Sequence, residues 1–267
     1  PLELDRRQRQ MCIRDRKKSG PTVTPTLAFE LGKLPAKRQV LIIGALAERG
    51  DPAGAPAVMA LLDTADGPVG VAAVEALTRF AHVPAVSVLA TLALGGEGEL
   101  RSASRKCLAS FPDPAADAAI AKFLESTDSG IRRLGTELIE LRATDVAVPV
   151  LLRTAAADRE EAVRVAALTV LRELAATSDL GALVQILVKA QSEVVRKSVT
   201  HALVVVCARE PVVGGEPSAA CVEPLVAALK QSSGPARQAL LKVLGRVGGT
   251  AAKEAVQAAT ADGDGKD

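Results

Sequence analysis

Histidine and cysteine are the side chains of this sequence best suited to bind a metal or attack a substrate, and both are scarce. The 267 residues include two histidines, His82 and His201, and four cysteines: Cys12, Cys107, Cys207 and Cys221. No two cysteines form a C-x-x-C pair, and the two histidines lie far apart in the chain. This spacing favours neither a metal site nor a disulfide framework. A Cys207–Cys221 bridge remains an alternative, and Cys107 is expected to be a small buried apolar residue.

The glycine-rich segment "GGEGE", Gly95–Glu99, is the sequence feature that most resembles a phosphate loop. A nucleotide-binding loop follows a β-strand, and no strand is predicted before this segment. We therefore expect a turn between helices there. His201 is expected to be an ordinary solvated side chain. These observations predict a protein that is not an enzyme, with no catalytic residue, no cofactor and no metal.

The composition indicates what kind of elements carry these residues. Apolar residues make up 48% of the chain, dominated by Ala, Val and Leu, with no Trp or Tyr and four Phe, which are expected in the core. A core of small aliphatic side chains suits closely packed, repetitive helices better than an irregular globular interior. No apolar window is long enough for a membrane span, and no leader is recognisable, so the default location is the cytoplasm.

A repeat of about 31 residues organises the chain. Segments such as "LRSASRKCLASF", "VRVAALTVLREL" and "VRKSVTHALVVV" align on a central aliphatic residue, and successive copies are 31, 31, 31, 32, 32 and 41 residues apart. The seven aligned residues are Leu46, Leu77, Leu108, Ile139, Leu171, Leu203 and Leu244. Periodicity maintained over seven copies indicates a repeat architecture.

Each copy has the pattern of an amphipathic helix. Apolar residues recur eight and four residues before the central residue and three after it, as in Val163, Ala167, Leu171 and Leu174, which places them on one helical face. A shorter apolar segment and a turn precede each copy, so one unit is helix A, turn, helix B. One pair cannot bury its apolar face alone. The sequence therefore predicts an all-α solenoid of about seven stacked antiparallel helix pairs over residues 21–260.

The motif "D/E-x-x-V-R-x-x-A-x-x-x-L-x-x-L" resembles HEAT repeats, in particular the short phycobilin-lyase type, from about Thr26 to Thr260. Gln39 and Gly70 stand where the motif arginine is expected. The resemblance implies an array from a longer bacterial protein. It also implies that the motif arginines are structural and pair with a turn acid, such as Asp128 or Asp158, or with a neighbouring unit. These arginines are Arg101, Arg132, Arg164, Arg196 and Arg237.

The resemblance further implies that the B helices line a concave, ligand-binding face. The candidate binding residues expected to be exposed on this face are Glu75, Arg79, Lys106, Arg133, Glu137, Glu173, Lys197, His201, Lys242 and Arg246. Their signs alternate, so no coherent field is expected along the face. A mixed surface of this kind suits a protein or peptide, and without aromatic side chains nucleic acid is not favoured. We expect a monomeric interaction scaffold. The alternative is an accessory or lyase-like domain that holds a cofactor beside a catalytic domain.

Two irregularities interrupt the array near its C-terminal end. The last interval is longer by nine residues, which lie within Cys207–Pro224. Such an insertion is either a tolerated surface loop or a carrier of binding specificity. The last predicted helix, Ala251–Thr260, has no partner helix, and residues 261–267 are predicted to be a disordered tail. These features indicate a fragment of a longer array.

The segment "MCIRDR", Met11–Arg16, differs from every repeat. Residues 1–20 carry a net charge of +4, so the other residues carry −2 of the total of +2. This segment matches the translation of the adapter used in transposase-based sequencing libraries. We interpret residues 1–20 as a disordered, chimeric artefact and exclude them from the functional argument. The remaining chain is nearly neutral.

Overall fold

The protein is an all-α structure in which every repeat is a pair of helices. The computed structural model describes residues 23–64, 67–211 and 216–261, which contain 15 α-helices and four short 3₁₀ helices. The chain divides into two compact units, residues 1–120 and 121–267. The predictions for residues 1–20 and for the tail beyond Ala261 lie outside the described residues.

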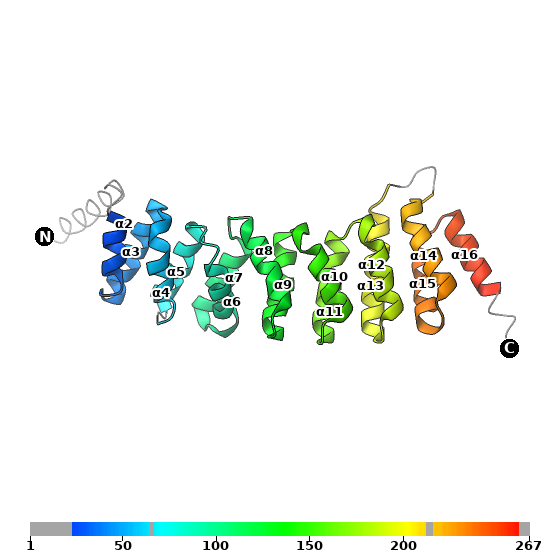
Figure 1. The fold of residues 1–267 in the computed structure, drawn as a ribbon, viewed down its shortest axis with the longest axis horizontal. Helices are drawn as coiled ribbons and strands as arrows, with labels where there is room; N and C mark the ends of the chain where they lie inside the picture. Colours follow the sequence, from blue (N-terminus) through cyan, green and yellow to red (C-terminus); the bar gives the residue numbers. More distant parts are fainter. Residues whose placement is uncertain (1–22, 65–66, 212–215, 262–267) are drawn as a thin grey trace. The chain divides into compact units, whose positions relative to one another are not determined.

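The first unit contains three complete helix pairs (Figure 1). The B helix α3 packs on α5, and α5 packs on α7, while the A helix α2 packs on α4. Its helices are α2 (Val23–Leu31), α3 (Ala36–Arg49), η1 (Pro52–Gly54), α4 (Ala55–Leu61), α5 (Gly67–Arg79), α6 (Ala85–Gly95), α7 (Gly98–Ala109) and α8 (Ala115–Ala121), which reaches the boundary.

The second unit repeats this arrangement. The B helices pack in the order α9, α11, α13, α15, and the A helices in the order α10, α12, α14, α16, so each unit is a solenoid with two helical layers. Its helices are η2 (Lys122–Glu125), α9 (Ser129–Arg142), η3 (Asp145–Ala147), α10 (Val148–Ala157), α11 (Glu161–Leu174), η4 (Thr177–Asp179), α12 (Leu180–Lys189), α13 (Glu193–Ala208), α14 (Ala219–Gln231), α15 (Gly234–Val247) and α16 (Thr250–Ala261).

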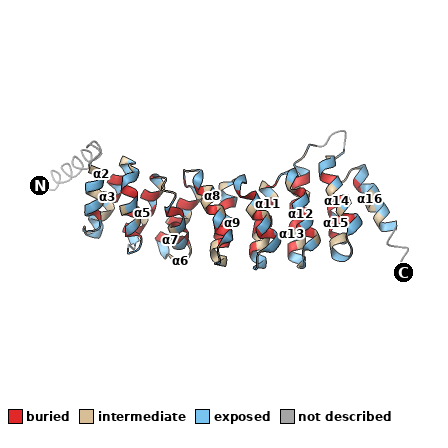
Figure 2. Cartoon of the chain, in the orientation of Figure 1, coloured by how far each residue is buried: buried red, intermediate tan, exposed pale blue. Residues whose placement is uncertain are grey.

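The seven aligned residues of the repeat form the centre of the core. Leu46 is 1% exposed and the other six are fully buried. Buried positions follow one side of each helix, and the exposed positions follow the other (Figure 2). The repeat register and the predicted helical solenoid are therefore confirmed.

Turn residues determine where the B helices begin. The Asp128 carboxylate accepts a hydrogen bond from the Gly130 amide at 2.7 Å, and the Ser192 hydroxyl accepts one from the Val194 amide at 3.1 Å. Pro235 stands in the first turn of α15. N-cap acceptors and an early proline satisfy or remove amides that have no partner within the helix.

A small residue four positions before the central residue lets the two helices of a pair approach. In α9 this residue is Gly135, and a Cβ atom there would lie 3.0 Å from Phe123 Cβ and 3.4 Å from Leu124 Cδ2. The packing of η2 against α9 therefore depends on the missing side chain.

One expectation about the core is wrong. Phe80, Phe111 and Phe123 are buried, but Phe29 is 71% exposed. Phe29 lies on α2, where no described element covers its ring, and the Lys33 ammonium lies 3.6 Å from the ring centroid.

Candidate functional site

The candidate binding residues all lie on B helices. We call the exposed side chains of the B helices, α5 and α7 in the first compact unit and α9, α11, α13 and α15 in the second, the B-helix face of each unit. All ten predicted residues are exposed: Glu75, Arg79, Lys106, Arg133, Glu137, Glu173, Lys197, His201, Lys242 and Arg246. The two-helix repeat explains this, because the residues six and two positions before the buried central residue, and two after it, point away from the A layer.

Four of the ten residues line a single groove between α13 and α15. The groove has a volume of about 810 Å³. The four are Lys197, His201, Lys242 and Arg246; the groove is also lined by Glu193, Arg196, Thr200, Pro235, Gln238 and Ala239. The structure does not bring the other six predicted residues into this groove.

The groove is more basic than the sequence suggested. Its lining has four cationic side chains and one carboxylate. The Glu193 carboxylate is bound to the Lys197 ammonium at 2.7 Å, and this hydrogen bond, with further attraction from Lys197, Arg196 and Lys242, lowers the pKa of Glu193. Among the described residues, Lys242 and Arg246 have no ion-pair partner. The alternation of signs along the whole face stays a prediction; within this groove, the packing of α13 on α15 brings together cations that are far apart in sequence.

The motif arginines bind the turns between helices A and B. Arg164 Nη1 donates to the carbonyl oxygens of Asp158 at 2.5 Å and Arg159 at 3.3 Å. Arg196 Nη1 donates in the same way to Ala190 and Gln191, and Arg132 Nη1 to Ser126 and Thr127. These carbonyls lie at or just beyond the C-terminal end of the A helix, where a cation is favourable.

The other motif positions make related contacts. Arg101 Nε donates to the Gly96 carbonyl at 2.7 Å, and Arg237 donates to Leu229 and, on α16, to Ala259. Gln39, which replaces the arginine in α3, donates to the Leu31 carbonyl at 3.3 Å. The substitution therefore retains a hydrogen bond to the end of the preceding A helix.

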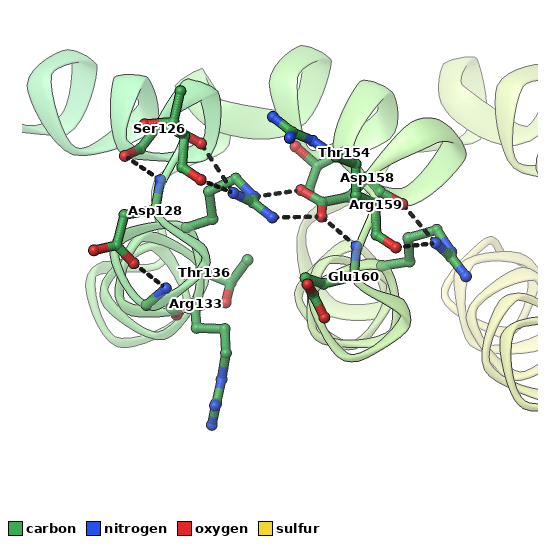
Figure 3. Close-up of polar contacts among 12 residues, drawn as sticks. Ser126, Asp128, Arg133, Thr136, Thr154, Asp158, Arg159 and Glu160 are labelled. Atoms are coloured by element: carbon green, nitrogen blue, oxygen red, sulfur yellow. Dashed lines mark hydrogen bonds and ion pairs between the residues drawn. The ribbon is translucent and has the colours of Figure 1, made fainter.

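Arg132 and Asp158 form a buried ion pair between successive repeats (Figure 3). The Arg132 guanidinium binds the Asp158 carboxylate through two hydrogen bonds of 2.7 and 3.0 Å, and both side chains are 6% exposed. The hydrogen bond to Asp158 raises the pKa of Arg132 above its ordinary value. Asp158 also accepts from the Glu160 amide at 2.9 Å, so one residue orders the turn before α11 and binds the previous repeat. Asp128, the other turn acid considered, caps α9 instead.

Three cysteines are buried free thiols. Cys107, Cys207 and Cys221 are 7%, 5% and 0% exposed, respectively. Burial raises the pKa of all three, and for Cys207 the contact with the Cys221 thiol raises it further. Helix packing therefore brings Cys207 and Cys221 together as free thiols, without a disulfide bond between them. Cys12 lies outside the described residues.

The remaining chemistry-bearing residues are dispersed. His82 lies in the turn after α5, and His201 lies on α13. Among the described residues, no three His, Cys, Asp or Glu side chains are grouped to hold a metal ion. In the same part of the chain, no helix combines the length and apolar character needed to cross a membrane.

The insertion contributes contacts that the repeat pattern did not indicate. Arg209 donates to the carbonyls of Arg172, Glu173 and Ala175 at the end of α11. At the other end of the insertion, Glu216 accepts hydrogen bonds from the Thr250 amide at 2.7 Å and hydroxyl at 2.5 Å. Residues 212–215 lie outside the described residues. Neither Arg209 nor Glu216 has an equivalent in the other repeats, so periodicity offers no signal for them.

Comparisons with known proteins do not assign the chain to a family. No known protein family and no curated protein matches the sequence. An engineered protein of known structure is 21% identical, with 93% of this chain and 77% of that chain covered and a TM-score of 0.41. The complex of CpcE and CpcF of phycocyanin lyase from Nostoc sp. PCC7120 is 16% identical, with 81% and 85% covered and a TM-score of 0.36. A second engineered protein is 17% identical, with 88% and 97% covered and a TM-score of 0.36. The HEAT assignment therefore stays a resemblance.

Proposed function

We propose that the protein is a non-catalytic scaffold that binds a protein or peptide partner through its B-helix face. The observation that carries this proposal is the exposure of all ten predicted residues on the B helices of the two compact units, together with the open groove between α13 and α15. A surface of mixed charge that is presented by a repetitive scaffold suits a folded or extended polypeptide, which offers charges of both signs.

The roles of the more reactive residues support a scaffold. The motif arginines Arg132, Arg164 and Arg196 donate hydrogen bonds to turn carbonyls or to the Asp158 carboxylate. Buried thiols with a raised pKa remain protonated at neutral pH and are poor nucleophiles. The contacts of the motif arginines and of the buried cysteines therefore give both sets of residues a structural role, and neither set requires a catalytic one.

Affinity capture with the immobilised chain, with and without nuclease treatment, tests this proposal. We expect proteins to be retained in both conditions and to be identified by mass spectrometry. Recovery of nucleic acid alone would contradict the proposal. A reading frame that continues into a catalytic domain would instead favour the accessory, cofactor-holding alternative, which stays a prediction.

A further inference from the structure

We infer that the groove between α13 and α15 binds an acidic segment of a partner protein. This inference rests on the proposed function and adds the chemistry of the partner. We call the groove the α13/α15 groove; its lining is the set of residues described above.

The groove's own carboxylate does not neutralise all of its positive charge. Glu193 is the one carboxylate in the lining, and Lys197 already binds it. Arg196 donates hydrogen bonds to the carbonyls of Ala190 and Gln191, and these bonds fix its guanidinium at the side of the groove. Lys242 and Arg246, one turn apart on α15, are exposed and have no ion-pair partner among the described residues. The groove therefore offers two available cations and a positive local field.

The available positive charge of the groove is confined to its own two helices. On α11, the residues that correspond to Lys242 and Arg246 are Thr169 and Glu173. Glu173 is bound by the neighbouring Arg172 at 2.8 Å. The available positive charge is therefore local to α13 and α15 and does not continue onto α11.

The size and the lining of the groove favour an acidic peptide over other anions. A groove of about 810 Å³ is large enough for several residues of a peptide. Thr200 and Gln238 in its lining can exchange hydrogen bonds with a peptide backbone. Its lining has no aromatic side chain on which a base could stack, and two available cations neutralise few phosphates. A short run of Asp and Glu side chains matches this number of charges better than a nucleic acid does.

Fluorescence anisotropy with a labelled peptide of alternating Glu and Ser tests the inference. The same measurement uses an alternating Gln and Ser peptide and a single-stranded oligonucleotide as competitors. We expect the Glu peptide to bind, to weaken as salt is added, and to resist competition by the Gln peptide. Stronger binding of the oligonucleotide, or no binding of the Glu peptide at low salt, would overturn the inference.

Two double variants locate the site. Lys242→Glu with Arg246→Glu reverses both available charges in the groove, and Lys230→Glu with Lys253→Glu makes the same charge change at exposed positions outside it. We expect the groove variant to lose about tenfold or more in affinity and the control variant to lose much less. Both variants change exposed residues, and circular dichroism verifies that each is folded. Equal losses would mean that net charge alone is responsible, and would overturn the inference.

Failure of the acidic-segment inference can be distinguished from failure of the scaffold proposal. If the groove variant still captures the same partner proteins as the wild type, then the scaffold proposal stands and the acidic-segment inference fails. If the wild type captures only nucleic acid, then the scaffold proposal itself fails.

Discussion

The Arg132–Asp158 pair shows how one side chain can join two repeats and also order the turn between two helices. Breaking a buried ion pair leaves a charge without a partner in a poorly solvated place. We therefore expect Arg132→Ala to lower the free energy of unfolding by about 3 kcal/mol, measured by urea denaturation.

The matched control is an exposed pair that joins the same two repeats. Arg153 Nη2 and Glu125 Oε1 lie 3.1 Å apart, but the side chains are 66% and 61% exposed. Solvent screens such pairs, so Arg153→Ala should cost less than about 1 kcal/mol. Equal effects of the two substitutions would show that burial of the Arg132 pair contributes nothing.

The three buried thiols should make the free energy of unfolding depend on pH in the alkaline range. Their pKa values are raised in the folded protein, so the unfolded chain releases these protons first. The protonated thiols therefore contribute to the free energy of unfolding. This contribution is complete below the ordinary pKa of 9.0 and is lost as the pH rises above it, by up to about 1.4 kcal/mol per pH unit for each thiol.

Urea denaturation of the wild type and of a variant with Cys107, Cys207 and Cys221 replaced by Ala checks this dependence. The variant should show a shallower decline of the unfolding free energy above pH 9 than the wild type. Parallel declines would mean that the thiols ionise equally in the folded and unfolded chains.

At the scale of the helix, α9 ends in a backbone conformation that its sequence does not favour. Ala143 has φ 49° and ψ 42°, a left-handed conformation in which a Cβ atom is crowded. Ala143→Gly should therefore raise the unfolding free energy by about 1 kcal/mol.

The control is an alanine with right-handed helical geometry. Ala156 is an exposed residue of α10, where glycine is the poorer helix former. Ala156→Gly should lower the unfolding free energy by about 1 kcal/mol. Thermal or urea unfolding of both variants measures the contrast, and the same sign of change in both would refute it.

The insertion holds the N-terminal end of α16 through Glu216. The hydrogen bonds from the Thr250 hydroxyl and amide lower the pKa of Glu216, and Pro217 Cδ would lie 2.5 Å from a Cβ atom at Gly249. We expect Glu216→Ala and Gly249→Ala to accelerate amide hydrogen exchange in α16, because this end helix would open locally.

Glu254 provides the control, because it is an exposed residue of the same helix away from its N-terminal end. Exchange in α16 should change much less in Glu254→Ala. If α16 exchanges at the wild-type rate in both Glu216→Ala and Gly249→Ala, the insertion does not hold this helix.

At the scale of the whole molecule, the repeat period accounts for what could be predicted. Leu46, Leu77 and their five counterparts are buried as expected, because identical spacing on one helical face determines the core. The exposure of the B-helix residues follows from the same register. The motif gave no signal for Arg209 and Glu216, since contacts made by an insertion have no period. The basic α13/α15 groove also escaped prediction, because Lys197 and Lys242 meet only when α13 packs on α15.

Cross-linking mass spectrometry of the captured complex, with a lysine-reactive reagent, tests most directly whether the B-helix face is the binding surface. Exposed lysines are present on both layers: Lys106, Lys197 and Lys242 on B helices, and Lys122, Lys189 and Lys230 on the A side. We predict that links to the partner concentrate on the B-helix lysines, with Lys197 and Lys242 most frequent. Links concentrated on Lys122, Lys189 and Lys230 would contradict the account.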